Sequence, residues 1–179
     1  MPNNGEELTN KINRSVIFVS NFHSMLQRVQ TIWLFFATAA IFSLFLFPYL
    51  QVFEPDGSGR ALKVTGVYES VGGQVVQTEA FLGLTIATVI LALIPFVTIF
   101  LFKDRKRQMM MCYLSIAGIL GFSFWLVQTA KQVLGTIRLQ TENYGLGVIL
   151  PSLAVLFIIL ALRGIRKDDK LIKSADRLR

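Results

Sequence analysis

Few side chains in this sequence have the chemistry to bind a metal or to act as a nucleophile. The chain has one cysteine, Cys112, and one histidine, His23. A structural zinc site needs four ligands, mostly Cys and His, and a disulfide needs two cysteines. The sequence also carries no nucleotide-binding motif. We therefore predict no metal centre, no intrachain disulfide and no cofactor.

Three carboxylates, Asp104, Asp168 and Asp169, are candidates for acid–base chemistry only by elimination. Asp104 lies in the segment KDRKRQ, and the other two lie in RGIRKDDKLIK. Each is surrounded by Lys and Arg, so balancing their charge is the simpler interpretation. An enzyme that acts on lipid head groups through these acids stays an alternative, because such a catalyst needs acids or a nucleophile near the membrane interface.

Two clusters of bases are the most distinctive polar feature of the chain. We expect them to attract anionic lipid head groups and to offer a docking surface to other membrane proteins. We do not predict nucleic-acid binding, because the basic tail has no interleaved aromatic residues. The predicted interaction surface consists of Lys103, Arg105, Lys106, Arg107, Arg166, Lys167, Lys170, Lys173 and Arg177.

Four apolar stretches separate these polar segments and must position them. They cover residues 31–50, 80–102, 109–130 and 144–162, and none contains a charged residue or a histidine. A helix needs about 20 apolar residues to cross about 30 Å of hydrocarbon. The whole chain is 53% hydrophobic, with a mean hydropathy of +0.55. These features predict an all-α membrane fold, a bundle of four transmembrane helices.

The distribution of Lys and Arg predicts the orientation of this bundle. Fourteen of the 18 bases lie in the N-terminal segment, the KDRKRQ turn or the tail, and four lie in the other two connections. Bases are enriched in loops on the cytoplasmic side of membranes. We therefore predict that both termini and the KDRKRQ turn are cytoplasmic.

The connection of residues 51–79 is predicted to lie outside the cytoplasm and to contain a small β-hairpin. Two β-rich runs, ALKVTGVYES and QVVQTE, flank a Gly-Gly pair, which is typical of a hairpin. Alternation along one strand would place Leu62, Val64, Gly66 and Tyr68 on one face. We expect this hairpin to cap the outer ends of the helices, or else to dock a second protein.

The two ends of the chain differ in character. The basic tail, residues 163–179, is predicted to continue the fourth helix into the cytoplasm. Residues 1–24 are polar and then weakly hydrophobic, and Met25 directly precedes a short lead into the first span. We predict that residues 1–24 are a disordered extension or the product of an upstream start, and that residues 25–179 form the membrane domain. Translation from Met1 or from Met25 stays open.

Three segments resemble one family. They are MLQRVQTIWLFFA, FLFKDRKRQMMMCYLSI and LPSLAVLFIILALRGIRKDDKLIKSADRLR. Together they are similar to a family of short bacterial four-helix inner-membrane proteins known as domain of unknown function 4293. The resemblance covers residues 25–179. It implies a Gram-negative inner membrane and a periplasmic outer loop, and it brings no activity with it.

We expect a non-enzymatic integral inner-membrane protein that serves as an accessory or scaffold subunit of a larger assembly. Ionisable side chains are confined to the loops, and the most distinctive segments are basic and cytoplasmic. A small oligomeric transporter or channel is the alternative, although the spans lack the carboxylate or histidine that ion-coupled transporters use. Its polar seam would come from Thr85, Thr88, Ser115, Ser123 and Gln128.

Overall fold

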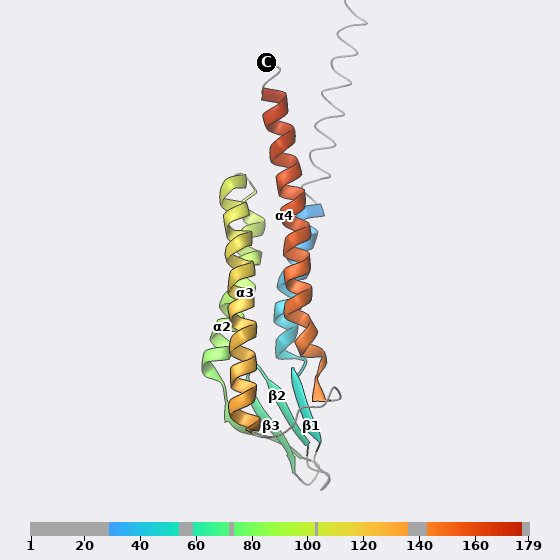
Figure 1. Cartoon of the computed structure of the whole chain (residues 1–179), viewed down its shortest axis with the longest axis vertical. Helices are drawn as coiled ribbons and strands as arrows, with labels where there is room; N and C mark the ends of the chain where they lie inside the picture. The colour runs from blue at the N-terminus through green and yellow to red at the C-terminus, as the bar shows by residue number, and fades with distance from the viewer. Residues whose placement is uncertain (1–28, 54–58, 72–73, 103, 136–142, 177–179) are drawn as a thin grey trace, which may run out of the picture.

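The chain forms an elongated bundle of helices with a small β-sheet at one end (Figure 1). The computed structural model describes residues 29–53, 59–71, 74–102, 104–135 and 143–176. The predicted extension of residues 1–24 lies outside them, as do Lys103 and Arg177. We call the end of the bundle that carries the sheet the sheet end, and the opposite end the basic end.

The described helices run along the long axis of the molecule. The first occupies Val29–Phe45, and its last turn is the 3₁₀ helix η1 (Ser43–Phe45). It is followed by α2 (Leu82–Phe100), α3 (Arg105–Leu134) and α4 (Ile149–Asp176), and the short η3 (Leu146–Val148) leads into α4. In the described residues, α2, α3 and the η3–α4 segment are long and apolar enough to cross a membrane, whereas the first helix is shorter. A crossing by the first helix therefore stays a prediction.

The first helix ends five residues before the predicted boundary at residue 50. The helix stops at Phe45, and Leu50 already belongs to a strand. Pro48 explains the difference, because proline lacks a backbone N–H and disfavours the helical conformation of the residue before it. Apolar residues therefore continue past the end of the helix, and the backbone N–H of Tyr49 donates to the carbonyl of Leu62 (2.9 Å).

The helix α3 extends beyond both ends of its predicted stretch, whereas α4 starts at residue 149 rather than 144 and extends beyond the C-terminal end of its stretch. Most of the KDRKRQ cluster forms the first turn of α3, where the Asp104 carboxylate caps the helix by accepting from the Arg107 N–H (3.2 Å). An acidic cap satisfies a backbone N–H that has no partner within the helix. The helix α4 continues through the basic tail to Asp176, which confirms the predicted helical extension.

The sheet is antiparallel and larger than the predicted hairpin. Its strands are β1 (Leu50–Phe53), β2 (Gly59–Lys63), β3 (Gly66–Val71) and β4 (Gln74–Ala80), paired in sequence order. The predicted hairpin around the Gly-Gly pair corresponds to β3 and β4. The run ALKVTGVYES is not one strand, because a two-residue turn divides it between β2 and β3.

This turn changes which side chains share a face. Leu62 pairs with Val67 across the two strands, and both are buried. Gly66 follows the turn with φ +152°, and a Cβ there would lie 2.0 Å from the carbonyl oxygen of Glu79. Only glycine fits a backbone in that conformation and at that distance. Because Leu62 shares a face with Val67, the neighbouring Tyr68 lies on the other face of the sheet. The predicted common face of residues 62, 64, 66 and 68 is therefore wrong.

The sheet end also joins the first helix to α4. The backbone N–H of Gly145 donates to the carbonyl of Tyr49 (3.1 Å), and that of Gly147 donates to the carbonyl of Pro48 (3.0 Å). A Cβ on Gly145 would lie 2.2 Å from the Pro48 oxygen. This close backbone contact fixes where α4 starts, and hence which of its residues meet the other helices at the basic end.

Candidate functional site at the basic end of the bundle

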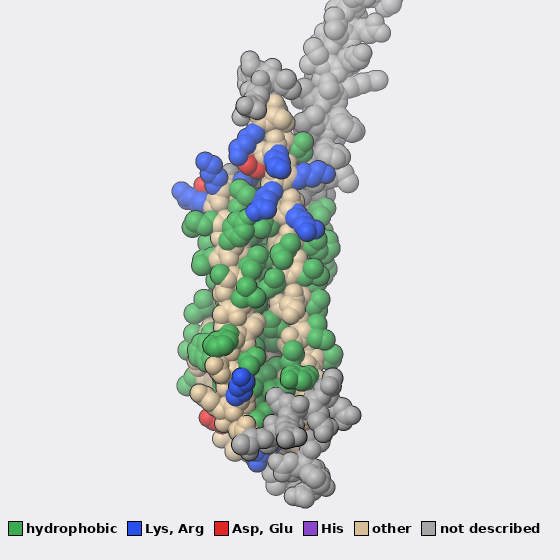
Figure 2. All heavy atoms as spheres, in the orientation of Figure 1, with side chains coloured by type: hydrophobic (Ala, Val, Ile, Leu, Met, Phe, Trp, Pro, Cys, Tyr) green, Lys and Arg blue, Asp and Glu red, His purple; other side chains and the backbone are tan. Residues whose placement is uncertain are grey.

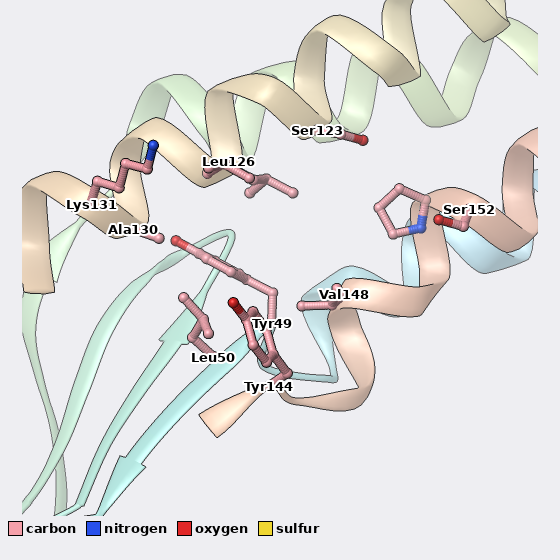
Figure 3. Close-up of a pocket in the computed structure, with 11 residues that line it drawn as sticks. Tyr49, Leu50, Ser123, Leu126, Ala130, Lys131, Tyr144, Val148 and Ser152 are labelled. Atoms are coloured by element: carbon pink, nitrogen blue, oxygen red, sulfur yellow. The ribbon is translucent and has the colours of Figure 1, made fainter. Parts of the chain in front are cut away.

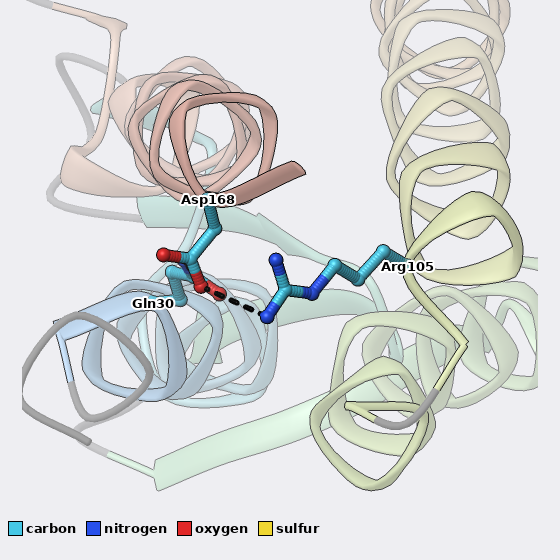
Figure 4. Close-up of polar contacts among 3 residues, drawn as sticks. All are labelled: Gln30, Arg105 and Asp168. Carbon is cyan, nitrogen blue, oxygen red and sulfur yellow. Dashed lines mark hydrogen bonds and ion pairs between the residues drawn. The ribbon is translucent and has the colours of Figure 1, made fainter. Parts of the chain in front are cut away.

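A buried polar cluster connects three helices at the basic end. Asp168 of α4 is 1% exposed and points toward the first helix and α3 (Figure 4). Its Oδ2 atom accepts a hydrogen bond from Nε2 of Gln30 (3.3 Å) and lies 3.6 Å from a guanidinium nitrogen of Arg105. Gln30 comes from the first helix and Arg105 from the first turn of α3. The cluster therefore joins segments that are far apart in the sequence.

Burial makes this cluster electrostatically important. A buried carboxylate is costly unless a cation and hydrogen-bond donors compensate its charge. The Arg105 side chain is 16% exposed, so it turns inward rather than contributing to an outward surface. Oδ1 of Asp168 has no hydrogen-bond partner among the described residues. The second carboxylate oxygen is thus an acceptor with unused capacity.

The other described bases of the predicted surface are exposed. Figure 2 shows Lys and Arg side chains gathered around the basic end, with a largely uncharged band below them. We call this group the basic collar. Arg163 belongs to it as well, although sequence reasoning left it out of the surface. The basic collar consists of Lys106, Arg107, Arg163, Arg166, Lys167, Lys170 and Lys173.

The two other carboxylates that were considered for catalysis lie in ion pairs on the surface. Oδ2 of Asp104 lies 2.9 Å from Nε of Arg107, and Oδ2 of Asp169 lies 2.6 Å from Nζ of Lys173. Arg166 donates a hydrogen bond to the Tyr113 hydroxyl and lies over its ring, 5.5 Å from the centroid. These contacts hold collar side chains against α3 and α4. In the described part of the chain, no group of three or more Cys, His, Asp or Glu residues is arranged to hold a metal.

Comparison with known proteins identifies the chain at the level of the family. A family model described as Domain of unknown function (DUF4293) matches residues 26–178. The chain belongs to this family. No curated protein matches the chain with significant similarity. The DUF4293 match contains all three residues of the buried cluster and the entire basic collar, so the site is part of the family domain.

Sequence reasoning missed two buried glutamines at the basic end of the DUF4293 domain, one of which belongs to the buried cluster. Gln30 holds Asp168, and the buried Gln108 donates from Nε2 to the carbonyl of Thr98 (3.4 Å). Each amide directly precedes a predicted span, at residue 31 or 109. An amide at that position was the available signal, since it can pair with a neighbouring helix at the point where the apolar stretch begins.

Proposed function

We propose that the chain is an integral membrane protein with four crossing helices and a cytoplasmic basic collar, and that it serves as a non-enzymatic accessory subunit of an inner-membrane assembly. The observation that supports the membrane location is the outward-facing apolar surface. In the most apolar stretch of α2 and in that of α3, only 28% of the residues are buried, and in that of Leu146–Leu171 the share is 33%. Large side chains such as Phe35, Phe124 and Leu156 are about half exposed or more. Water would penalise such a surface, whereas lipid would not.

Helix length is compatible with this placement. At about 1.5 Å per residue, the 17 residues of the first helix span about 25 Å and the 19 residues of α2 about 28 Å. Both values are close to the hydrocarbon thickness of about 30 Å, and a short helix can be accommodated by local thinning. The first helix can therefore act as the fourth crossing segment.

The basic collar supports the orientation and the subunit role. Positive charge on one side of the bundle favours a cytoplasmic location for that side. The 28 residues of α4 measure about 42 Å, so about 12 Å of this helix extends beyond the hydrocarbon. Figure 1 shows α4 projecting past α2 and α3. This arm presents Lys170, Leu171 and Lys173 to the surroundings, all of them exposed, and it offers an acidic partner protein both charge and an apolar contact.

Single-cysteine labelling tests the location and the orientation. Cys112 is the one cysteine of the sequence, so a Cys112→Ser background has no thiol of its own to react with a maleimide. In spheroplasts, a membrane-impermeant maleimide should label Thr78→Cys on the exposed strand β4 at once. It should label Lys170→Cys only after permeabilisation. The reverse pattern, or release of the protein from membranes by alkaline carbonate without detergent, would contradict the proposal.

Affinity purification in a mild detergent tests the subunit role. The wild-type chain should recover a partner in stoichiometric amount, and a Lys167→Gln/Lys170→Gln variant should lose it as salt-sensitive contacts disappear. Lys63→Gln, on the sheet, is the matched control and should retain the partner. Consistent purification of the wild-type chain alone would count against an accessory subunit.

The channel alternative gains no support from the hydroxyls that were to form its seam. Those of Thr85, Thr88, Ser115 and Ser123 donate to carbonyls one turn earlier in their own helices (2.7–2.9 Å). Back-bonded hydroxyls are satisfied without a water-filled path. A subunit whose helices pack in lipid therefore explains these hydroxyls more simply than a channel does.

A further inference from the structure

An apolar cavity lies at the sheet end, between α3 and the start of α4. Its volume is about 260 Å³. Tyr49 and Leu50 contribute to it from the junction of the first helix and the sheet (Figure 3). The remaining walls come from α3, from Tyr144 and from the η3–α4 segment. They are Ser123, Leu126, Val127, Ala130, Lys131, Tyr144, Val148, Pro151 and Ser152.

The Tyr49 hydroxyl is the polar group that this cavity leaves unexplained. The side chain is 3% exposed, and its hydroxyl has no hydrogen-bond partner among the described residues. Figure 3 shows it directed toward α3, beside Ala130. Buried hydroxyls are nearly always paired. This one is therefore placed to donate to an acceptor that the described chain does not supply.

Lys131 defines the charge of a suitable ligand. Its side chain is exposed and lines the same cavity, so it stands at the rim. None of the described lining residues is acidic. An apolar chamber with one cation at its mouth favours an amphiphile with an anionic head and a hydrocarbon tail. A partner helix, about 10–12 Å wide with its side chains, is too broad for this volume.

We propose that the cavity binds one acyl chain of an anionic phospholipid from the outer leaflet. The lipid phosphate lies beside Lys131. The Tyr49 hydroxyl is closed off from solvent in the free chain, and a small rotation of its side chain toward the cavity lets an ester oxygen accept its hydrogen bond. This inference rests on the proposed membrane location. Ser123 precedes Lys131 by eight residues on α3, a rise of about 12 Å. The cavity thus runs from the interface into the hydrocarbon, as an acyl chain does.

Lipid-dependent thermal stability of the delipidated, detergent-purified full chain tests the proposal, with phosphatidylglycerol as the probe. Phosphatidylethanolamine provides the comparison without net charge. Tyr49→Phe should weaken phosphatidylglycerol binding about fivefold, the effect of one hydrogen bond. Lys131→Gln should weaken it by a similar factor and remove the preference over phosphatidylethanolamine. Ala130→Leu, which fills the cavity, should weaken binding more than tenfold.

Two features of the design separate lost binding from lost folding. Tyr49→Phe removes a hydroxyl that lacks a partner, so without lipid it should melt at the wild-type temperature or above. Tyr68→Phe and Lys63→Gln are matched controls on the sheet, outside the cavity, and should bind as the wild type does. Equal phosphatidylglycerol affinity of wild type, Tyr49→Phe and Ala130→Leu would overturn the proposal, as would equal affinity for both lipids. Neither result would affect the maleimide test of membrane location.

Discussion

Replacement of Arg105 by Gln should destabilise the bundle because it leaves the Asp168 carboxylate buried without its cation. The two charged groups are 3.6 Å apart, and their side chains are 16% and 2% exposed. At an effective dielectric constant of 20, charges at this distance attract each other by about 5 kcal/mol, before the cost of desolvation is subtracted. Removal of one partner from a buried pair typically costs about 3–5 kcal/mol. We expect Arg105→Gln to lower the free energy of unfolding by about 3 kcal/mol, the lower end of this range, because Arg105 keeps partial access to solvent.

Thermal unfolding in detergent, followed through the fluorescence of Trp33 and Trp125, measures this effect. A chain of this size loses about 2–4 °C for each kcal/mol, so Arg105→Gln should lower the midpoint by about 6–12 °C. Lys173→Gln is the matched control. It breaks an exposed ion pair of 2.6 Å with Asp169, and exposed pairs of this kind contribute about 0.5 kcal/mol or less.

A double-mutant cycle isolates the interaction itself. Asp168→Asn removes the buried charge and keeps an amide that can still bond to Gln30. The Arg105→Gln/Asp168→Asn variant should therefore be more stable than the sum of the single effects implies, by about 2 kcal/mol. The reasoning would be refuted if the two single effects added, or if Arg105→Gln were no more harmful than Lys173→Gln.

Two further substitutions test the close contacts of the fold. Gly66→Ala should lower the free energy of unfolding by about 2 kcal/mol or more. Its Cβ would meet the Glu79 oxygen, and the backbone conformation of residue 66 disfavours side chains. Limited proteolysis of the sheet at neutral pH should therefore be faster than in the wild type. Gly118→Ala should lower the free energy of unfolding by about 1 kcal/mol in a thermal melt, because its Cβ would lie 2.6 Å from the Leu91 side chain. The Cβ of Gly121→Ala would meet nothing within 4 Å, so this control should be neutral or slightly stabilising. Equal effects at the two α3 glycines would contradict the packing of α2 against α3.

The sequence by itself determined where the long apolar helices lie and where the positive charge gathers. Transfer of side chains into lipid is nearly a sum of local contributions, so charge-free stretches can be recognised without a structure. The helical tail also followed from its local pattern, and it ends at Asp176 in α4 among the described residues. The β3–β4 hairpin was predictable because the Gly-Gly pair and the flanking β-rich runs are neighbours in the chain.

Only the tertiary structure decided how the polar residues divide between surface and interior. Arg105, Lys106 and Arg107 are adjacent and chemically alike, yet successive helical residues point about 100° apart. Arg105 turns inward because Asp168 lies on the facing side of α4, while its two neighbours are exposed. The Gln30–Asp168 bond joins residues 138 positions apart, and the burial of Tyr49 depends on where α3 and α4 pass the sheet. The partners in such contacts are chosen by helix packing, which the local sequence does not specify.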